Sequence, residues 1–290
     1  MANLAIDVLQ PELTAHFEAL MAREALSHAY LFAGGYGRYE MAIYLAQAVF
    51  CENRQGNGAP DGVCRACRLI ASGEFSELHV LVPDGQTIKI EQVRELLEAF
   101  VETGFESEKK VIIISEAERL TTVAANALLK AIEEPVRETF VFLLTGNENR
   151  VLATIRSRAQ LVHFPRNVTL IAEMLEKSGV QATEARFAAS LADSKDEALE
   201  LGESAWFSEG IKKLSRLVEI ASEDLTEAYL YLSNLTELFE DKKQQEVAFE
   251  VLLMLASQAG LVKMTTKIFE AQRLWRANVN FRSALESVCL

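Results

Sequence analysis

The sequence predicts an α/β domain built on a parallel sheet, followed by a small helical unit and a terminal helical bundle. Apolar, strand-like runs alternate with helical segments up to about residue 165, a glycine turn links the first such pair, and we identify no strand from 168 to 290. Alternation of strand and helix with short links favours a parallel sheet covered on both faces. The expected domains are therefore 1–166, 167–206 and 207–290.

The first part of the chain predicts a strand, a turn and a helix. Residues 1–25 carry apolar side chains at helical spacing, and the run AYLFA at 29–33 is a short strand. The turn GGYG follows at 34–37, and the helical pattern MAIYLAQAVF follows that turn. Glycines between an apolar run and a helical pattern are typical of a tight strand-to-helix turn.

The rest of the α/β region repeats this alternation. Runs at 78–82, 111–115 and 139–146 predict strands, and the last two are continuous apolar runs of the kind found in strands buried on both faces. Segments 90–102 and 121–134 predict helices, the second ending before Pro135.

Beyond Pro165 every periodic segment is helical. Short helical pieces are expected at 170–179, 184–192 and 196–204. Longer helices are expected at 211–221, 225–240 and 245–259, followed by a helical run to residue 290.

The composition argues against several classes of protein. The formal net charge is −13, whereas proteins that bind mainly by neutralising phosphates need a basic face. No stretch of 18 apolar residues lacks a charge, and the N-terminus lacks the basic start and apolar run of a signal peptide. We expect a cytoplasmic protein.

The glycine turn has the frame of a phosphate-binding loop but not its functional residues. Such a loop needs a second glycine, a lysine and a hydroxyl at fixed spacing. Counted from Gly34, these positions hold Tyr39, Glu40 and Met41. A carboxylate about 4 Å from a phosphate oxygen is repelled by roughly 4 kcal/mol at an effective dielectric of 20. One interpretation is therefore a site that has lost nucleotide binding, and the other is an α/β domain that never had it.

The strand at 111–115 favours the first interpretation. In phosphate-binding ATPases a buried strand ends in an acid that holds magnesium, and a second acid follows. Here the corresponding positions are Ser115 and Glu116. A ligand is missing at both places, so we expect no ATP and no magnesium to be bound. The segment from Asp7 to Phe17 is placed near this turn without an assigned role.

Three of the four cysteines cluster in a loop-like segment. Cys51, Cys64 and Cys67 lie among several glycines, and the last two form a Cys-x-x-Cys pair. In a protein that is not exported, this pattern indicates metal binding or redox chemistry rather than disulfides.

Several motifs in order resemble the clamp-loader branch of the AAA+ ATPases. They are SHAYLFAGGYG at 27–37, the cysteine segment at about 51–79, NALLKAIEEP at 126–135 and TFVFLLTGNENRVLATIRSRAQ at 139–160. The C-terminal RLWRANVNFRSALESVCL resembles the last helix of the collar by which the bacterial members assemble. The resemblance implies a P-loop NTPase-like domain at 1–166, a helical lid at 167–206 and a helical collar at 207–290.

Within that branch, the loss of the lysine and of the magnesium acid resembles the subunit that does not hydrolyse ATP. The resemblance implies a rigid stator in a ring with the gamma/tau and delta subunits of bacterial DNA polymerase III. That ring opens a sliding clamp and loads it on primed DNA during replication.

The resemblance also implies a role for Arg158. The family's Ser-Arg-Cys motif matches Ser157, Arg158 and Ala159, and its arginine reaches a neighbour's bound ATP as an arginine finger. An arginine supplied in trans is worth about 10³–10⁵ in rate. The alternative is an ordinary solvated arginine after a strand.

Family members hold one zinc ion with four cysteines, and the fourth position here falls on Asp61. Aspartate can bind zinc, so the resemblance leaves open either a site of three cysteines and one aspartate or a module without metal. Two other functions require features that this sequence lacks. An ATP-hydrolysing subunit of the same ring needs a lysine at 40 and an acid at 115, and a zinc-dependent nucleic-acid adaptor needs a basic face.

Overall fold

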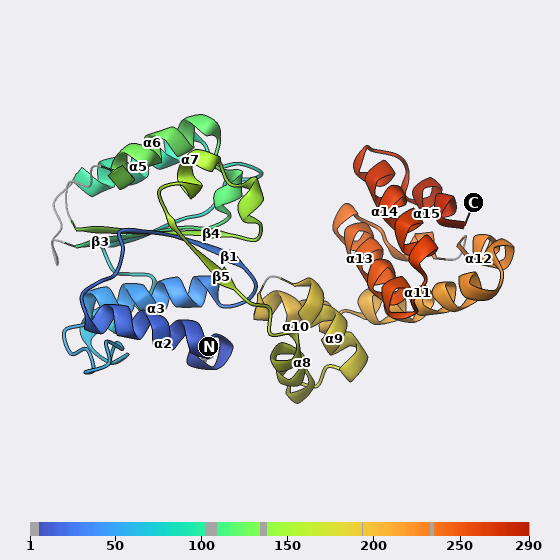
Figure 1. The fold of residues 1–290 in the computed structure, drawn as a ribbon, viewed down its shortest axis with the longest axis horizontal. Coiled ribbons are helices and arrows are strands. Elements are labelled where there is room, and N and C mark those ends of the chain that lie inside the picture. The colour runs from blue at the N-terminus through green and yellow to red at the C-terminus, as the bar shows by residue number, and fades with distance from the viewer. Residues whose placement is uncertain (1–5, 102–108, 134–137, 193, 233–234, 290) are drawn as a thin grey trace. The chain divides into compact units, whose positions relative to one another are not determined.

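In a computed structural model of the chain, residues 6–101, 109–133, 138–192, 194–232 and 235–289 are described (Figure 1). The chain divides into two compact units, Met1–Asn167 and Val168–Leu290. The further division of the second unit at residue 206, into a lid and a collar, stays a prediction.

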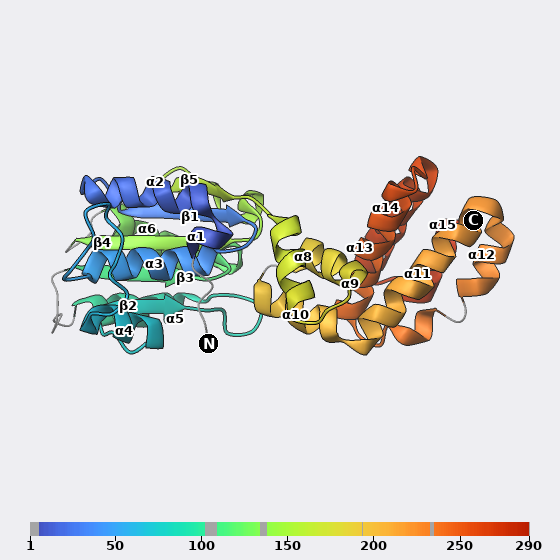
Figure 2. The same ribbon diagram turned by 90° about the horizontal axis from the view of Figure 1, so that it is seen from below.

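The first unit is built on one five-stranded sheet in the order β2-β3-β4-β1-β5 (Figure 2), and every pairing in it is parallel. The strands are β1 (Ala29–Gly34), β2 (Leu78–Leu81), β3 (Lys110–Ile114), β4 (Thr139–Thr145) and β5 (Gln160–Phe164). β3 and β4 are buried along their whole length, as expected of continuous apolar runs in the middle of a parallel sheet. The parallel α/β prediction is confirmed.

Strand β5 was not predicted from the sequence. Its sequence, QLVHF, is not a continuous apolar run, and most of the strand is exposed. β5 lies at an edge of the sheet and pairs only with β1, so it needs less apolar surface than a central strand.

Helices cover both faces of the sheet. In Figure 1, α5, α6 and α7 lie over one face, and α2 and α3 lie over the other. The helices of this unit are α1 (Ile6–Leu9), α2 (Pro11–Ala22), α3 (Arg38–Phe50), α4 (Arg65–Ser72), α5 (Ile90–Val101), α6 (Thr122–Glu133) and α7 (Ala153–Arg156). α4 begins inside the segment that we expected to be a loop, and the helix end expected at Pro135 lies outside the described residues.

The two faces of the sheet carry different side chains because successive strand residues point in opposite directions. Leu31, Ile112 and Leu143 belong to an aliphatic core shared with α5 and α6. On the other face, Phe17 of α2 packs against Tyr30 and Phe32 of β1, with ring centroids 5.3 and 5.6 Å apart. This aromatic layer fixes α2 on the sheet beside the glycine turn that follows β1.

The second unit contains only helices among its described residues. They are α8 (Val168–Lys177), α9 (Ala182–Leu191), α10 (Lys195–Glu203), α11 (Ala205–Glu223), α12 (Leu225–Tyr231), α13 (Lys242–Gln258), α14 (Val262–Arg276) and α15 (Phe281–Cys289). One expected helix is shorter than predicted. The segment 225–240 is helical to Tyr231, and only a single 3-10 turn follows at Thr236–Leu238.

The C-terminal run is also two helices and not one. Asn278 lies between α14 and α15 with a left-handed backbone (φ 68°), which ends a right-handed helix. Asparagine is one of the few residues that adopts this conformation readily. Across the described part of the chain, none of the helices combines the length and the apolar character needed to cross a membrane.

Candidate functional site

The glycine turn follows β1 and is pressed against the end of β5. Gly34 and Gly37 have positive φ angles of 107° and 89°, which L-residues with side chains rarely adopt. A Cβ atom on Gly34 would lie 2.7 Å from the carbonyl oxygen of Phe164, and the N–H of Gly35 donates to that same oxygen at 2.7 Å. The backbone conformation therefore favours glycine at positions 34 and 37 whether or not a ligand binds.

Side chains of the protein itself pack into the turn. Gln10 is buried, and its Nε2 donates to the carbonyl of Tyr36 at 2.8 Å and to that of Pro165 at 3.0 Å. A Cβ on Gly37 would lie 2.9 Å from Cδ1 of Ile6, and one on Gly35 would lie 2.6 Å from Cγ of Arg166. The segment expected to pack near the turn thus does so, through Gln10.

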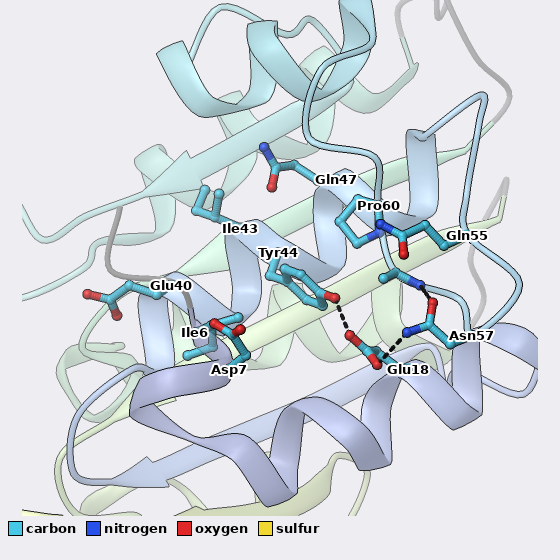
Figure 3. A pocket seen from close by; sticks show the side chains of 11 residues that line it. Ile6, Asp7, Glu18, Glu40, Ile43, Tyr44, Gln47, Gln55, Asn57 and Pro60 are labelled. Atoms are coloured by element: carbon cyan, nitrogen blue, oxygen red, sulfur yellow. Dashed lines mark hydrogen bonds between the residues drawn. The ribbon is translucent and has the colours of Figure 1, made fainter. Parts of the chain in front are cut away.

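The residues at the lysine and hydroxyl positions offer nothing to a phosphate. Met41 is fully buried, and Tyr39 is largely exposed. Glu40 lines a pocket of about 390 Å³ between α1, α3 and the loop before α4 (Figure 3). Asp7 and Glu18 line the same pocket, and no lysine or arginine is among the described residues of its wall. The described wall of this pocket is therefore acidic.

Hydrogen bonds join several side chains in the wall of this pocket. The hydroxyl of Tyr44 donates to Glu18 at 2.6 Å, and Nδ2 of Asn57 donates to the other oxygen of that carboxylate at 2.9 Å (Figure 3). Burial, followed by the bond to Glu18, raises the pKa of Tyr44 well above its usual value. Tyr44 thus keeps its proton at neutral pH and donates a hydrogen bond to Glu18.

Ser115 and Glu116 directly follow β3, at the same edge of the sheet as the glycine turn. The N–H of Ser115 donates to the carbonyl of Leu81 at 2.9 Å. Glu116 has a left-handed backbone (φ 51°), and its carboxylate pairs with Nε of Arg119 at 2.6 Å. The carboxylate at this position is therefore neutralised within the chain.

The cysteine segment brings four ligand residues together. The ligand atoms of Cys51, Asp61, Cys64 and Cys67 all lie within 4.8 Å of one another, and all the cysteines are free thiols. Sγ of Cys51 and Sγ of Cys64 are 4.0 Å apart, close to the separation of about 3.8 Å implied by a tetrahedral site with Zn–S bonds of about 2.3 Å. The cluster is compatible with one zinc ion.

Backbone N–H groups support three of these ligands. Those of Val63 and Cys64 both donate to Oδ1 of Asp61 at 3.0 Å, that of Asp61 to Sγ of Cys51 at 3.3 Å, and that of Cys67 to Sγ of Cys64 at 3.4 Å. Such bonds stabilise the anionic forms that bind metals. The N–H of Cys64, followed by that of Val63, holds the pKa of Asp61 well below its usual range.

The thiols respond differently to their surroundings. Burial raises the pKa values of Cys51 and Cys67. Burial alone would raise the pKa of Cys64 as well, but hydrogen bonds led by the N–H of Cys67 lower it overall. Since zinc binds thiolates, binding at this cluster would release protons.

Arg158 follows α7 at the surface, where its side chain is 41% exposed. Its Nε forms an ion pair with Glu133, and its Nη1 donates to the carbonyl of Thr154 at 3.2 Å and to Oγ of Ser157 at 3.3 Å. Ser157 caps the C-terminus of α7, and its own hydroxyl donates to Thr154 at 3.0 Å. Sequence reasoning did not anticipate Glu133 as a partner of this arginine.

Comparisons with known proteins agree with this architecture. A family model described as DNA polymerase III, delta subunit, matches residues 9–168. The DNA polymerase III subunit delta' of Bacillus subtilis (strain 168) is 36% identical, and the alignment covers 97% of this chain and 95% of that protein. The delta' subunit of Escherichia coli (strain K12) is also 36% identical, over 52% of this chain and 47% of its own length.

Two further relatives are more distant. The gamma/tau subunit of DNA polymerase III from Mycobacterium bovis is 33% identical over 63% of this chain and 33% of its own length. A crystal structure of a DNA polymerase III gamma subunit-related protein from Thermotoga maritima covers 97% of both chains with a TM-score of 0.51 and 18% identity, which shows the shared fold. The predicted fold class is confirmed. Because the family model matches more than half of the chain and a relative 36% identical aligns along nearly all of it, the chain belongs to the delta' family of DNA polymerase III subunits.

Proposed function

We propose that this chain is the clamp-loader subunit that neither binds nor hydrolyses ATP, and that it acts as a stator beside the gamma/tau and delta subunits. In this role it helps to open a sliding clamp and load it on primed DNA. The family membership supports the clamp-loader role, and the named partners follow from the resemblance of the sequence motifs.

The observation that carries the proposal is the filled glycine turn. Gln10 uses its side-chain amide to join the turn at Tyr36 to the chain after β5 at Pro165, so the shape of the turn is held by a side chain of the protein itself. Ile6 and Arg166 pack against the glycines on either side of Tyr36. A nucleotide phosphate would have to bind beside these side chains and without a lysine.

Electrostatics acts in the same direction. Asp7, Glu18 and Glu40 surround the pocket beside the turn. A repulsion of about 4 kcal/mol between one carboxylate and one phosphate oxygen would correspond to roughly a thousandfold loss of affinity before screening. The alternative, an ATP-hydrolysing subunit like gamma/tau, would need the opposite charge at residue 40.

In the proposed role, Arg158 supplies an arginine finger to ATP bound by a neighbouring subunit. Its guanidinium is exposed, and its Nη2 has no hydrogen-bond partner among the described residues. A planar guanidinium whose Nη2 is available can donate to a phosphate oxygen. The replacement of the motif's cysteine by Ala159 leaves the guanidinium unchanged.

We also propose that the cluster of Cys51, Asp61, Cys64 and Cys67 holds a structural zinc ion. Zinc would tie the loop before α4 to the end of α3, because Cys51 directly follows α3 and the other ligands lie in or beside α4. Its contribution is to folding rather than to chemistry, since a four-ligand site has no open position for a reactant.

Two measurements test the main proposal. Titration of the isolated chain with millimolar ATP and magnesium should give no saturable binding and no phosphate release. Arg158→Ala in a ring reconstituted with gamma/tau and delta should lower ATP hydrolysis at the site that faces this chain by about 10³-fold or more. Saturable ATP binding would refute the stator role, and unchanged ring hydrolysis would refute the role of Arg158.

A further inference from the structure

We propose that Glu133 is a positioning residue that aims the Arg158 guanidinium at the neighbour's ATP, an inference that rests on the proposed function. Glu133 is the last described residue of α6, and Arg158 follows α7, 25 positions later in the chain. Their ion pair therefore joins two separate helices at the point from which the arginine projects.

The contacts of Arg158 with described residues occupy two of the three guanidinium nitrogens. Nε is taken by the Glu133 carboxylate. Nη1 is taken by the carbonyl of Thr154 at 3.2 Å and by the hydroxyl of Ser157 at 3.3 Å. Three partners at two nitrogens fix the orientation of a planar group. In the described part of the chain, Nη2 is left without a partner and is the nitrogen available to an outside anion.

This arrangement matters because an arginine side chain loses conformational freedom when it binds. A group that is ordered before docking loses less freedom on docking, and a misplacement of about 1 Å at a reacting centre can cost about 10² in rate. The ion pair is also 41% and 46% exposed at its two side chains, so solvent screens its contribution to stability. Its effect is expected on geometry more than on folding.

The opposite possibility is that Glu133 competes with the phosphate for the arginine. The atoms involved argue against it, since the carboxylate occupies Nε and not Nη2. A competitor would be expected to occupy the end of the guanidinium that the phosphate needs.

The test uses the full chain assembled into a ring with gamma/tau and delta, measured at the ATP site that faces this chain. Glu133→Ala removes the acceptor, whereas Glu133→Gln keeps an oxygen that can accept from Nε. Glu133→Ala should lower kcat by about 10-fold to 10²-fold with little change in KM, and Glu133→Gln should retain most of the wild-type kcat. Glu24→Ala is the matched control, because it removes the partner of another surface arginine, Arg54, at 4.0 Å.

A second measurement does not depend on activity. In the isolated, isotope-labelled chain, hydrogen exchange at Nε of Arg158 should be slow in the wild type and in Glu133→Gln, and fast in Glu133→Ala. A loss of general structure would alter the amide spectrum as a whole, whereas loss of positioning would alter this one signal.

Arg158→Ala, measured alongside, separates the possible failures. If Arg158→Ala leaves hydrolysis unchanged, the arginine has no role in trans. The arginine-finger role and the positioning role of Glu133 are then both refuted. If Arg158→Ala lowers hydrolysis while Glu133→Ala matches the wild type, only the positioning role is refuted. If both Glu133 variants raise the rate, Glu133 competes with the phosphate, which also overturns positioning.

Discussion

Gln10 shows how one polar side chain can occupy a turn of the nucleotide-binding type. It is buried, and burial of an amide is unfavourable unless its hydrogen bonds are made. The carbonyls of Tyr36 and Pro165 supply two acceptors for its Nε2. The side chain thus has a structural role at the glycine turn.

A charge-restoring substitution tests whether this occupation matters. Glu40→Lys supplies the missing cation, yet we expect no saturable ATP binding at millimolar concentration, because Gln10 and Ile6 still pack into the turn. Isothermal titration with ATP and magnesium measures this.

Glu40→Gln serves as the control that removes the negative charge without adding a positive one. The double variant Glu40→Lys with Gln10→Ala separates the effect of charge at residue 40 from the effect of the Gln10 side chain packed at the turn. Binding by Glu40→Lys alone would mean that charge was the sole obstacle at the turn.

Candidate site residues at a fixed spacing within one motif could be proposed from the sequence. Residues that contact the site from distant positions in the chain could not. Glu40, Met41 and Ser115 follow from spacing along one segment. Gln10 reaches acceptors 26 and 155 positions away, and Glu133 reaches Arg158 over 25 positions. No local pattern encodes such contacts, because they depend on how the strands are ordered in the sheet.

At the level of elements, the loop that carries Asp61 is fitted closely to α2. A Cβ atom on Gly58 would lie 2.4 Å from the carbonyl oxygen of Glu18 and 2.7 Å from the backbone nitrogen of Ala22. The same loop bonds α2 through Asn57 and Glu18. The position of this cysteine-containing segment thus depends on the absence of a side chain at Gly58.

Two alanine substitutions in this loop should behave oppositely. Gly58→Ala should lower the free energy of unfolding by more than about 1 kcal/mol, because φ is +92° and backbone atoms of α2 occupy the space. Gly56→Ala meets no atoms within 4 Å and should be neutral or stabilising by up to about 1 kcal/mol. Denaturant unfolding measures both, and equal effects would contradict the close fit of the loop.

The same contrast between local and distant information explains which elements were predicted. β3 and β4 carry the continuous apolar runs of buried strands, so their sequences suffice. β5 is an exposed edge strand that is defined by its partner β1, and its sequence alone gives no such signal. The break at Asn278 depends on one backbone conformation that a helical pattern across it hides.

At the scale of the whole molecule, the chain has two units, each with buried side chains of its own. The first has the sheet core around Leu31 and Ile112, and the second has fully buried residues such as Phe249 of α13. The cluster of Cys51, Asp61, Cys64 and Cys67, where we propose a zinc site, lies entirely within the first unit. A ligand bound there should stabilise that unit only.

Removal of metal tests this separation. In scanning calorimetry, a strong zinc chelator should lower the melting temperature of the first unit and leave that of the second unchanged. Each kcal/mol lost from the free energy of unfolding should lower the melting temperature by about 2–4 °C. Phe249→Ala should identify the second transition by lowering it, since such core truncations cost about 3–5 kcal/mol. Cys64→Ser should be insensitive to the chelator. A chelator effect on both transitions, or on neither, would contradict the proposed site.

The amide of Gln10 has one last implication for the assembled machine. A diffusing molecule leaves its site when its concentration falls, whereas a side chain on the same polypeptide is present at a fixed local concentration. If this chain binds no nucleotide, as we propose, the shape of its first unit does not change with the ratio of ATP to ADP in the cell. Neighbouring subunits that do respond to that ratio would move against a part that keeps its form through every cycle.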